Sequence, residues 1–158
     1  MIYKERKIRK KILKKFEDEG FKVVEHKENK PSTYGLSQWY AMVDVREGKK
    51  CVELNALKGT VVVSALLHEL VHIFDQKPCE RLCRNVFGYN EEYRKEEFVA
   101  LSTHRIMLRE LEIDCEMFGD VWRCWQHDFP EPKVRQQLGP EIRRRLQLVR
   151  EVVQDEQQ

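Results

Sequence analysis

The sequence contains no apolar run long enough to cross a lipid bilayer, and its first residues lack the apolar core of a secretory signal. It also has little net charge, since 29 basic residues oppose 27 acidic ones, which gives little support to nucleic-acid binding by the protein as a whole. At 158 residues, the chain can bury a hydrophobic core without disulfides or a structural metal. We therefore expect a single soluble, cytoplasmic domain over residues 1–158 without a transmembrane segment, in which a bound metal would serve catalysis.

Cysteines are few and odd in number, which argues against a framework of disulfides. In a reducing compartment the expected state is the free thiol. Cys79 and Cys83 form a C-x3-C pair, and Cys115, Cys124 and His127 offer further metal donors. Because these spacings are loose, free thiols are the preferred interpretation, and a second metal site stays open.

The segment from Thr60 to Asp75 carries the most specific motif in the chain. His68, Glu69 and His72 spell H-E-x-x-H, which on a helix places two imidazoles on one face with a carboxylate beside them. Apolar residues surround nearly the whole segment, so this helix is expected to be buried. The motif predicts a zinc site with His68 and His72 as ligands and Glu69 as the general base that takes a proton from the attacking water.

The third metal ligand must come from another part of the chain. The extended pattern H-E-x-x-H-x-x-G-x-x-H fails, because Asp75 and Pro78 stand where its glycine and third histidine would be. On the next predicted helix, Glu97 shares a face with the small residue Ala100, which would allow the two helices to approach closely. Glu97 is therefore the predicted third ligand, whereas Glu96 would point about a quarter turn away.

Two further polar residues have open roles. His104 lies two helical turns after Glu97 on the same face, where it would donate to the oxyanion, orient a ligand or simply pack in the core. Asp75, one turn after His72, is a candidate acceptor for the free N–H of a ligand imidazole, although helix termination explains it equally well.

The pattern of apolar residues predicts an α+β fold, in which a small, partly antiparallel sheet packs on the motif helix and on a second, ligand-bearing helix. Amphipathic helices are expected at both ends of the chain. The expected helices cover residues 2–16, 60–75, 90–114 and 132–153, and the expected strands cover residues 21–25, 40–45 and 51–54.

Several details of this fold can be predicted from single residues. Residues 47–49 favour a hairpin turn, Thr60 is a candidate helix cap, and Gly139-Pro140 should kink or restart the last helix. The aromatic stretch 118–132 is interpreted as a packed connection, and residues 143–145, three arginines, are expected on the outer face of the last helix.

The order of these parts resembles the ImmA/IrrE family of zinc metallopeptidases. The likeness covers roughly Phe21 to Arg109 and rests on L-L-H-E-L-V-H, which contains His68, Glu69 and His72, and on the E-x-x-A run that begins at Glu97. The resemblance implies a gluzincin-like fold with Zn2+ on both histidines and Glu97, Glu69 as the base, and limited proteolysis of proteins, often transcriptional repressors.

A second resemblance rests on the longer phrase H-E-L-V-H-I-F-D. It is similar to the mitochondrial inner-membrane processing peptidases that assist ATP synthase assembly, and Cys79 and Cys83 match the cysteine-rich surroundings of that family.

Together these patterns predict a zinc-dependent metalloendopeptidase that hydrolyses peptide bonds of a protein substrate with activated water. The substrate is expected to lie extended along the edge of the sheet, at residues 51–54. The competing interpretation is a non-catalytic, zinc-containing domain that binds nucleic acid or an acidic protein through its basic N-terminal helix and residues 143–145.

Overall fold

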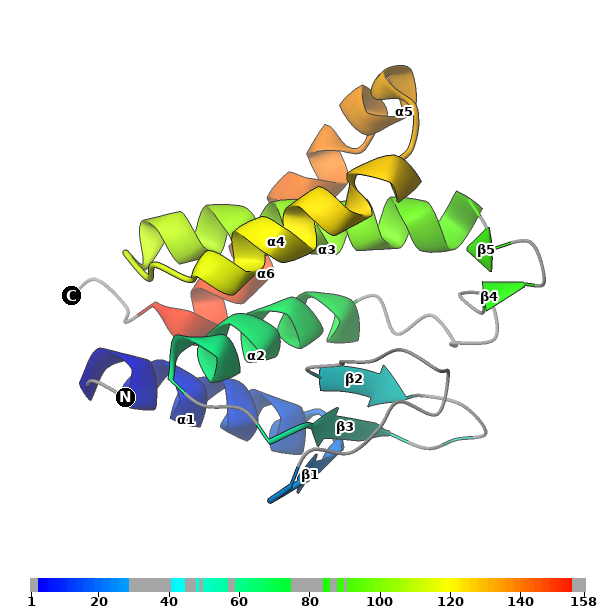
Figure 1. Cartoon of the computed structure of the whole chain (residues 1–158). Helices are drawn as coiled ribbons and strands as arrows, with labels where there is room; N and C mark the ends of the chain where they lie inside the picture. The colour runs from blue at the N-terminus through cyan, green and yellow to red at the C-terminus, as the bar shows by residue number, and fades with distance from the viewer. Residues whose placement is uncertain are drawn as a thin grey trace.

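Helix α2 (Thr60–Ile73), which carries the H-E-x-x-H motif, lies in the middle of the protein. The computed structural model describes residues 3–28, 41–44, 48, 50–56, 59–74, 84–85, 88–89 and 91–154. Figure 1 shows α1 (Tyr3–Asp18) and a small sheet on one side of α2, and α3 (Glu91–Glu110), α4 (Glu116–Trp125) and α6 (Gly139–Val153) on the other. α2 contacts α1, α3, α6 and strand β2, so the predicted α+β class is confirmed.

The sheet has three strands in the order β1 (Lys22–Glu25), β3 (Cys51–Leu54) and β2 (Ala41–Asp44). β2 runs antiparallel to β3 with Val43 opposite Val52, whereas β1 runs parallel to β3. The prediction that residues 51–54 form the sheet edge is wrong, because β1 pairs with the side of β3 that β2 leaves free. The burial of Val52 and Leu54 is consistent with this central position, and among the strands that the structure describes β1 and β2 are the outer ones.

The N-cap of α2 lies one residue earlier than the sequence predicted. Gly59, not Thr60, is the N-cap, and Thr60 is the first helical residue. Gly59 has a φ of 63°, which glycine adopts at little cost and a threonine would not. The helix ends at Ile73, while Asp75, its predicted end, lies outside the described residues.

α3 ends at Glu110 rather than at Asp114 because the chain turns there in a Schellman motif. The N–H of Ile113 donates to the carbonyl of Leu108, the N–H of Glu112 donates to the carbonyl of Arg109, and Glu112 has a φ of 54°. A glycine usually occupies the left-handed position at the end of a helix, but here Glu112 does. The sequence therefore contained no glycine to indicate where α3 ends.

The chain after α3 is more helical than predicted. The stretch interpreted as a connection contains α4 and the 3-10 helix η3 (Gln126–Asp128). The expected restart at Gly139-Pro140 is confirmed, since α5 (Pro132–Gln137) ends just before α6 begins. A short ladder of β4 (Arg84–Asn85) and β5 (Gly88–Tyr89) was not predicted.

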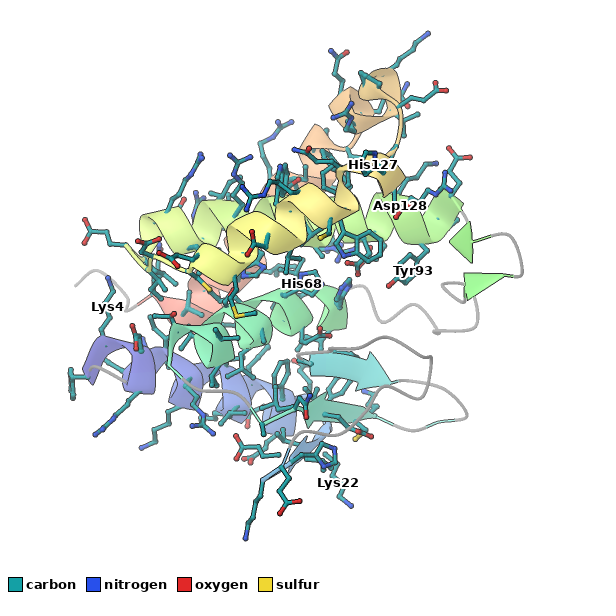
Figure 2. All side chains as sticks on the ribbon, in the orientation of Figure 1. Lys4, Lys22, His68, Tyr93, His127 and Asp128 are labelled. Atoms are coloured by element: carbon teal, nitrogen blue, oxygen red, sulfur yellow. The ribbon has the colours of Figure 1, made fainter. Side chains whose placement is uncertain are left out.

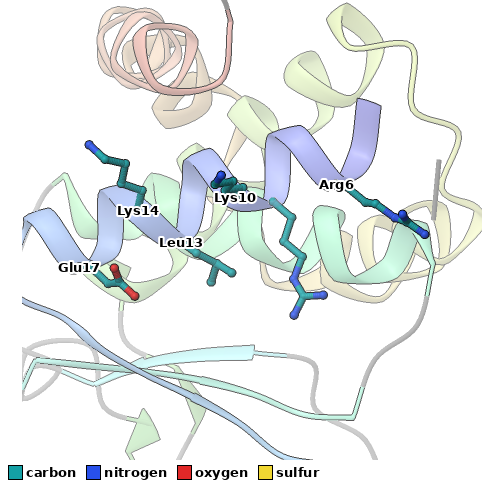
Figure 3. Close-up of a pocket in the computed structure, with 6 residues that line it drawn as sticks. Arg6, Lys10, Leu13, Lys14 and Glu17 are labelled. Atoms are coloured by element: carbon teal, nitrogen blue, oxygen red, sulfur yellow. The ribbon is translucent and has the colours of Figure 1, made fainter. Parts of the chain in front are cut away.

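α1 is amphipathic as predicted and buries Ile8, Ile12 and Phe16. Its other side faces a groove that Figure 3 shows in close-up. The groove is lined by Arg6, Arg9, Lys10, Leu13, Lys14 and Glu17. Within the described ranges, none of the helices combines the length and apolar character needed to cross a membrane.

Candidate metal centre

His68, His72 and Glu97 bring their ligand atoms together between α2 and α3. The Nε2 atom of His72 lies 2.8 Å from Oε1 of Glu97, and the Nε2 atom of His68 lies 3.4 Å from Oε2 of the same carboxylate. The two imidazole Nε2 atoms are 3.0 Å apart. Tetrahedral bonds of 2.0–2.1 Å to one zinc ion would hold two nitrogens about 3.3 Å apart. The three donors therefore already lie close to the spacing that one ion requires.

Helix geometry explains how residues distant in sequence meet here. His68 and His72 are one turn apart and share a face of α2, and Glu97 faces them from α3. Ala100, three residues after Glu97, is fully buried, and its small side chain allows α3 to approach α2 closely. Figure 2 shows His68 between α2 and α4 in this view, on the side of α2 toward α3. All three residues predicted as ligands are thus adjacent to one another.

Glu69 lies beside the cluster and contacts strand β2 of the sheet. Its side chain is buried, and the backbone N–H of Val43 on β2 donates a hydrogen bond to its carboxylate. Burial raises the pKa of Glu69, while the neighbouring histidines and the Val43 hydrogen bond act in the opposite direction. A carboxylate with a raised pKa next to two histidines has the proton affinity that a general base requires.

Glu96 and Arg145 adjoin the centre, although the sequence motifs predicted neither of them there. Glu96 was expected to point away, yet its Oε1 accepts a hydrogen bond from His72 Nδ1 over 3.1 Å. Arg145 was expected on the outer face of α6 beside Arg143 and Arg144, but its side chain is 1% exposed and pairs with both oxygens of Glu96 at 2.9 Å. The outer-face prediction is therefore wrong for Arg145, because its guanidinium compensates the buried charge of Glu96.

The two carboxylates that adjoin the histidines are held in their charged form. Burial would raise the pKa of Glu96, but hydrogen bonds from His72 and Arg145 outweigh it and lower the pKa to about 2. Burial opposes ionisation of Glu97 too, yet the two histidines hold its pKa well below the usual range. Burial alone would lower the pKa of His72, but the charge of Glu97 and the Glu96 hydrogen bond raise it well above 6.5. Arg145 neutralises the charge of Glu96. The negative charge of Glu97 can therefore be neutralised by a protonated His72 or by a bound metal ion.

His104 lies deeper between the helices than the metal donors. It is 4% exposed, its Nε2 lies 2.8 Å from the hydroxyl of Ser64, and its ring packs against Phe118 at 4.4 Å between centroids. Burial lowers the pKa of His104 well below 6.5, so its imidazole is neutral near pH 7. Its ring centroid is 5.6 Å from that of His68. A catalytic role for His104 stays a prediction.

A layer of aromatic rings packs between α3 and the segment that runs from α4 to Phe129. Tyr93 of α3 stacks near Trp125 at 5.9 Å, and Phe129 lies 5.0 Å from Trp122 and 5.2 Å from Phe98. Figure 2 shows Tyr93 near the start of α3, beyond the C-terminal end of α2. The stretch predicted as an aromatic connection therefore does pack on the ligand-bearing helix, although as α4 and η3.

The structure describes only some of the residues named for a second metal site or as the acceptor for a ligand imidazole. Cys79, Cys83 and Asp75 lie outside the described residues, while Cys115 is a buried free thiol and Cys124 an exposed one. In the part of the chain that the structure describes, His68, His72 and Glu97 form the one group of three or more such donors that converge, within 4.8 Å.

Comparison with known proteins added no relative to this picture, since no family model, no curated protein and no solved structure matched the chain.

Proposed function

We propose that this protein is a zinc-dependent metallopeptidase with a zincin-like arrangement of its motif helix, ligand helix and sheet. The observation that carries the proposal is the convergence of His68, His72 and Glu97 from two helices, with Glu69 one residue away and not among the ligands. Two imidazoles and one carboxylate are a donor set of catalytic zinc sites, which use three protein ligands and leave a position for water.

In this proposal each residue has a separate task. Zinc held by His68, His72 and Glu97 would polarise the attacking water and the carbonyl of the scissile bond. Glu69 accepts the proton of the water and delivers it to the amine that leaves, a task suited to its raised pKa. The Val43 N–H fixes the Glu69 carboxylate on the side of the cluster that faces β2.

The same hydrogen bond suggests how the substrate lies. Within the described part of the sheet β2 is an outer strand, so an extended peptide can add to it by backbone hydrogen bonds. Since Glu69 contacts β2 at Val43, a peptide aligned along β2 would bring its backbone next to the proposed base. We therefore place the substrate along β2 rather than along β3.

The test combines metal content with cleavage. The purified protein should bind one zinc ion and cleave labelled casein or a peptide library, and a chelator should abolish cleavage until zinc is restored. Glu69→Gln should retain zinc and lose cleavage by roughly 10²–10⁴-fold, the usual contribution of a general base. Glu5→Gln, which changes a buried glutamate of α1, is the matched control and should remain active. Full activity of Glu69→Gln would refute the assignment of the base.

A second candidate function rests on the groove of α1. Arg6, Arg9, Lys10 and Lys14 line it, and Figure 3 shows Arg6, Lys10 and Lys14 spaced along this helix. Such a surface suits the phosphates of a nucleic acid. Lys10→Glu should then weaken binding of a labelled oligonucleotide, with a steep dependence on salt, whereas Lys133→Glu on α5 should not. Binding that is equal in both variants, or insensitive to salt, would exclude this function.

A further inference from the structure

Arg145 joins three helices at one buried point beside the proposed metal centre. Its Nη1 donates to the carbonyl oxygen of Val71 on α2 at 2.9 Å, and its Nη1 and Nη2 each donate to one oxygen of Glu96 on α3. Its Nε donates to Glu141, one turn earlier on α6, at 2.7 Å. Every nitrogen of this guanidinium therefore has an acceptor, which fixes both its position and its plane.

We propose that Arg145 is a positioning residue of the metal centre, which acts through Glu96 to fix the orientation of the ligand His72. The inference rests on the proposed function, because it takes His72 as a zinc ligand. Glu96 Oε1 lies 2.9 Å from Arg145 Nη1 and 3.1 Å from His72 Nδ1, so one oxygen atom links the guanidinium to the imidazole.

The direction of this hydrogen bond decides which nitrogen His72 offers to a metal. An ionised carboxylate only accepts hydrogen bonds, so Glu96 places the proton of His72 on Nδ1. The lone pair used for a metal is then on Nε2, the atom that faces His68 and Glu97. Partners of this kind orient metal-binding histidines in many proteins, and their loss typically weakens metal binding 10–100-fold.

Arginine has a geometric advantage over other cations at this position. Its planar fork binds both oxygens of Glu96 and still has N–H groups for Val71 and Glu141, whereas a lysine ammonium would act as a point charge. Without the fork, the Glu96 carboxylate can rotate about its bonds and move away from His72. The proposal therefore predicts that Arg145→Lys restores zinc binding incompletely.

The protein contains a matched pair that separates positioning from simple helix docking. Arg150, also on α6, binds Glu110, also on α3, through two nitrogens at the surface. This pair joins the same two helices as Arg145 and Glu96 do, but Glu110 lies more than three helical turns along α3 from Glu97. Arg150→Met thus reports what the loss of an arginine between α3 and α6 does by itself.

The experiment compares Arg145→Met, Arg145→Lys and Arg150→Met with the natural protein by two measurements. Competition with a chelator gives the Kd for zinc, and ¹H–¹⁵N NMR of the metal-free protein detects the Nδ1 proton of His72 and its protection from exchange. We expect Arg145→Met to weaken zinc binding about 10–100-fold and to lose this protected proton. Arg145→Lys should lie between, and Arg150→Met should change neither measurement.

If Arg145→Met does not fold, a double variant that removes both charges of the buried Glu96–Arg145 pair can be tested instead. Glu96→Gln/Arg145→Met removes both charges of the buried pair and leaves an amide oxygen as an acceptor for His72. Because both residues act through one hydrogen bond, the double variant should lose zinc affinity, and by no more than the larger of the losses measured for Glu96→Gln and Arg145→Met alone. Zinc binding and an Nδ1 proton like those of the natural protein, in Arg145→Met or in the double variant, would overturn the proposal. If the natural protein binds no zinc, the proposed function fails, and the Nδ1 proton alone then decides the role of Arg145.

Discussion

The Nδ1 atom of His72 on α2 lies 3.1 Å from Oε1 of Glu96 on α3, the residue directly before Glu97. Consecutive residues of a helix are rotated by about 100°, so two adjacent glutamates seldom reach the same histidine. Here Glu97 reaches Nε2 of His72 and Glu96 reaches Nδ1, and the imidazole is held between them. The pair Glu96-Glu97 thus supplies a proposed ligand and the partner that orients another ligand.

The role of Glu97 as a ligand can be tested by removing its charge. Glu97→Gln should weaken zinc binding by more than the 10–100-fold typical of residues that only support a ligand, because a coordinating oxygen loses its charge. Metal analysis and chelator competition measure this effect. Glu92→Gln, at an exposed position of the same helix, should bind zinc normally. If Glu97→Gln keeps its zinc, another group must be the third ligand.

The Ser64–His104 pair should matter for stability. Ser64→Ala removes the hydrogen-bond partner of Nε2 in a histidine that is 4% exposed, and an unsatisfied buried group costs about 1–3 kcal/mol. Urea denaturation should show this loss, while the zinc content stays that of the natural protein. Ser102→Ala, half-buried on α3, is the control. An unchanged free energy of unfolding would mean that water replaces the serine hydroxyl.

The Glu110–Arg150 pair predicts a small dependence of stability on pH. The hydrogen bond from Arg150 lowers the pKa of Glu110 below 4.5 in the folded protein. The unfolded state therefore binds this proton more readily, and the pair stabilises the fold above pH 4.5 and ceases to do so as the pH falls through the lower, folded-state pKa. Because both side chains are partly exposed, the effect should be at most about 1 kcal/mol.

The measurement for this pair is the difference in unfolding free energy between the natural protein and Glu110→Gln. The difference should be present at neutral pH and disappear well below pH 4.5. A difference that grows on acidification would contradict the assigned direction of the pKa shift.

Close approach of α2 and α3 depends on Ala100. This residue is fully buried, and Ala100→Leu would add three carbons to a packed interface, at a typical cost of 1–3 kcal/mol. The helices must then separate, so zinc affinity should fall together with the melting temperature. Glu92→Leu adds apolar volume at an exposed site of α3 and should affect neither. Normal zinc binding in Ala100→Leu would show that the site does not need this close contact.

The sequence allowed the local parts of the site to be predicted, because local rules determine them. The spacing of His68 and His72 places both on one face of a helix, and the small residue at Ala100 singled out the face of α3 that carries Glu97. The strands at residues 51–54 and 22–25 were likewise found from their apolar, β-branched residues. In each case one short segment contains the whole signal.

Relations between distant segments were less accessible from the sequence. Three consecutive arginines, 143–145, look alike in a sequence, and only the packing of α6 against α3 places Arg145 next to Glu96. The partner of Glu96 could have been suspected from the need of a buried carboxylate for a cation, but not identified. β3 is central because β1, from an earlier part of the chain, pairs with the side of β3 that β2 leaves free. The apolar pattern of a single strand does not reveal which strands will pair with it.

The hydrogen bond between Arg145 and the carbonyl of Val71 connects residues 74 positions apart and has a consequence for biosynthesis. Val71 is among the last four residues of α2, and the carbonyl groups of these residues accept no hydrogen bond from within the helix. The positive charge of Arg145 at this end of α2 also balances the negative end of the helix dipole. A ribosome-bound chain that has exposed the H-E-x-x-H segment but not yet α6 lacks this group. If the proposed metal centre binds zinc, the nascent protein should therefore reach its full zinc affinity only after its last helix has been translated.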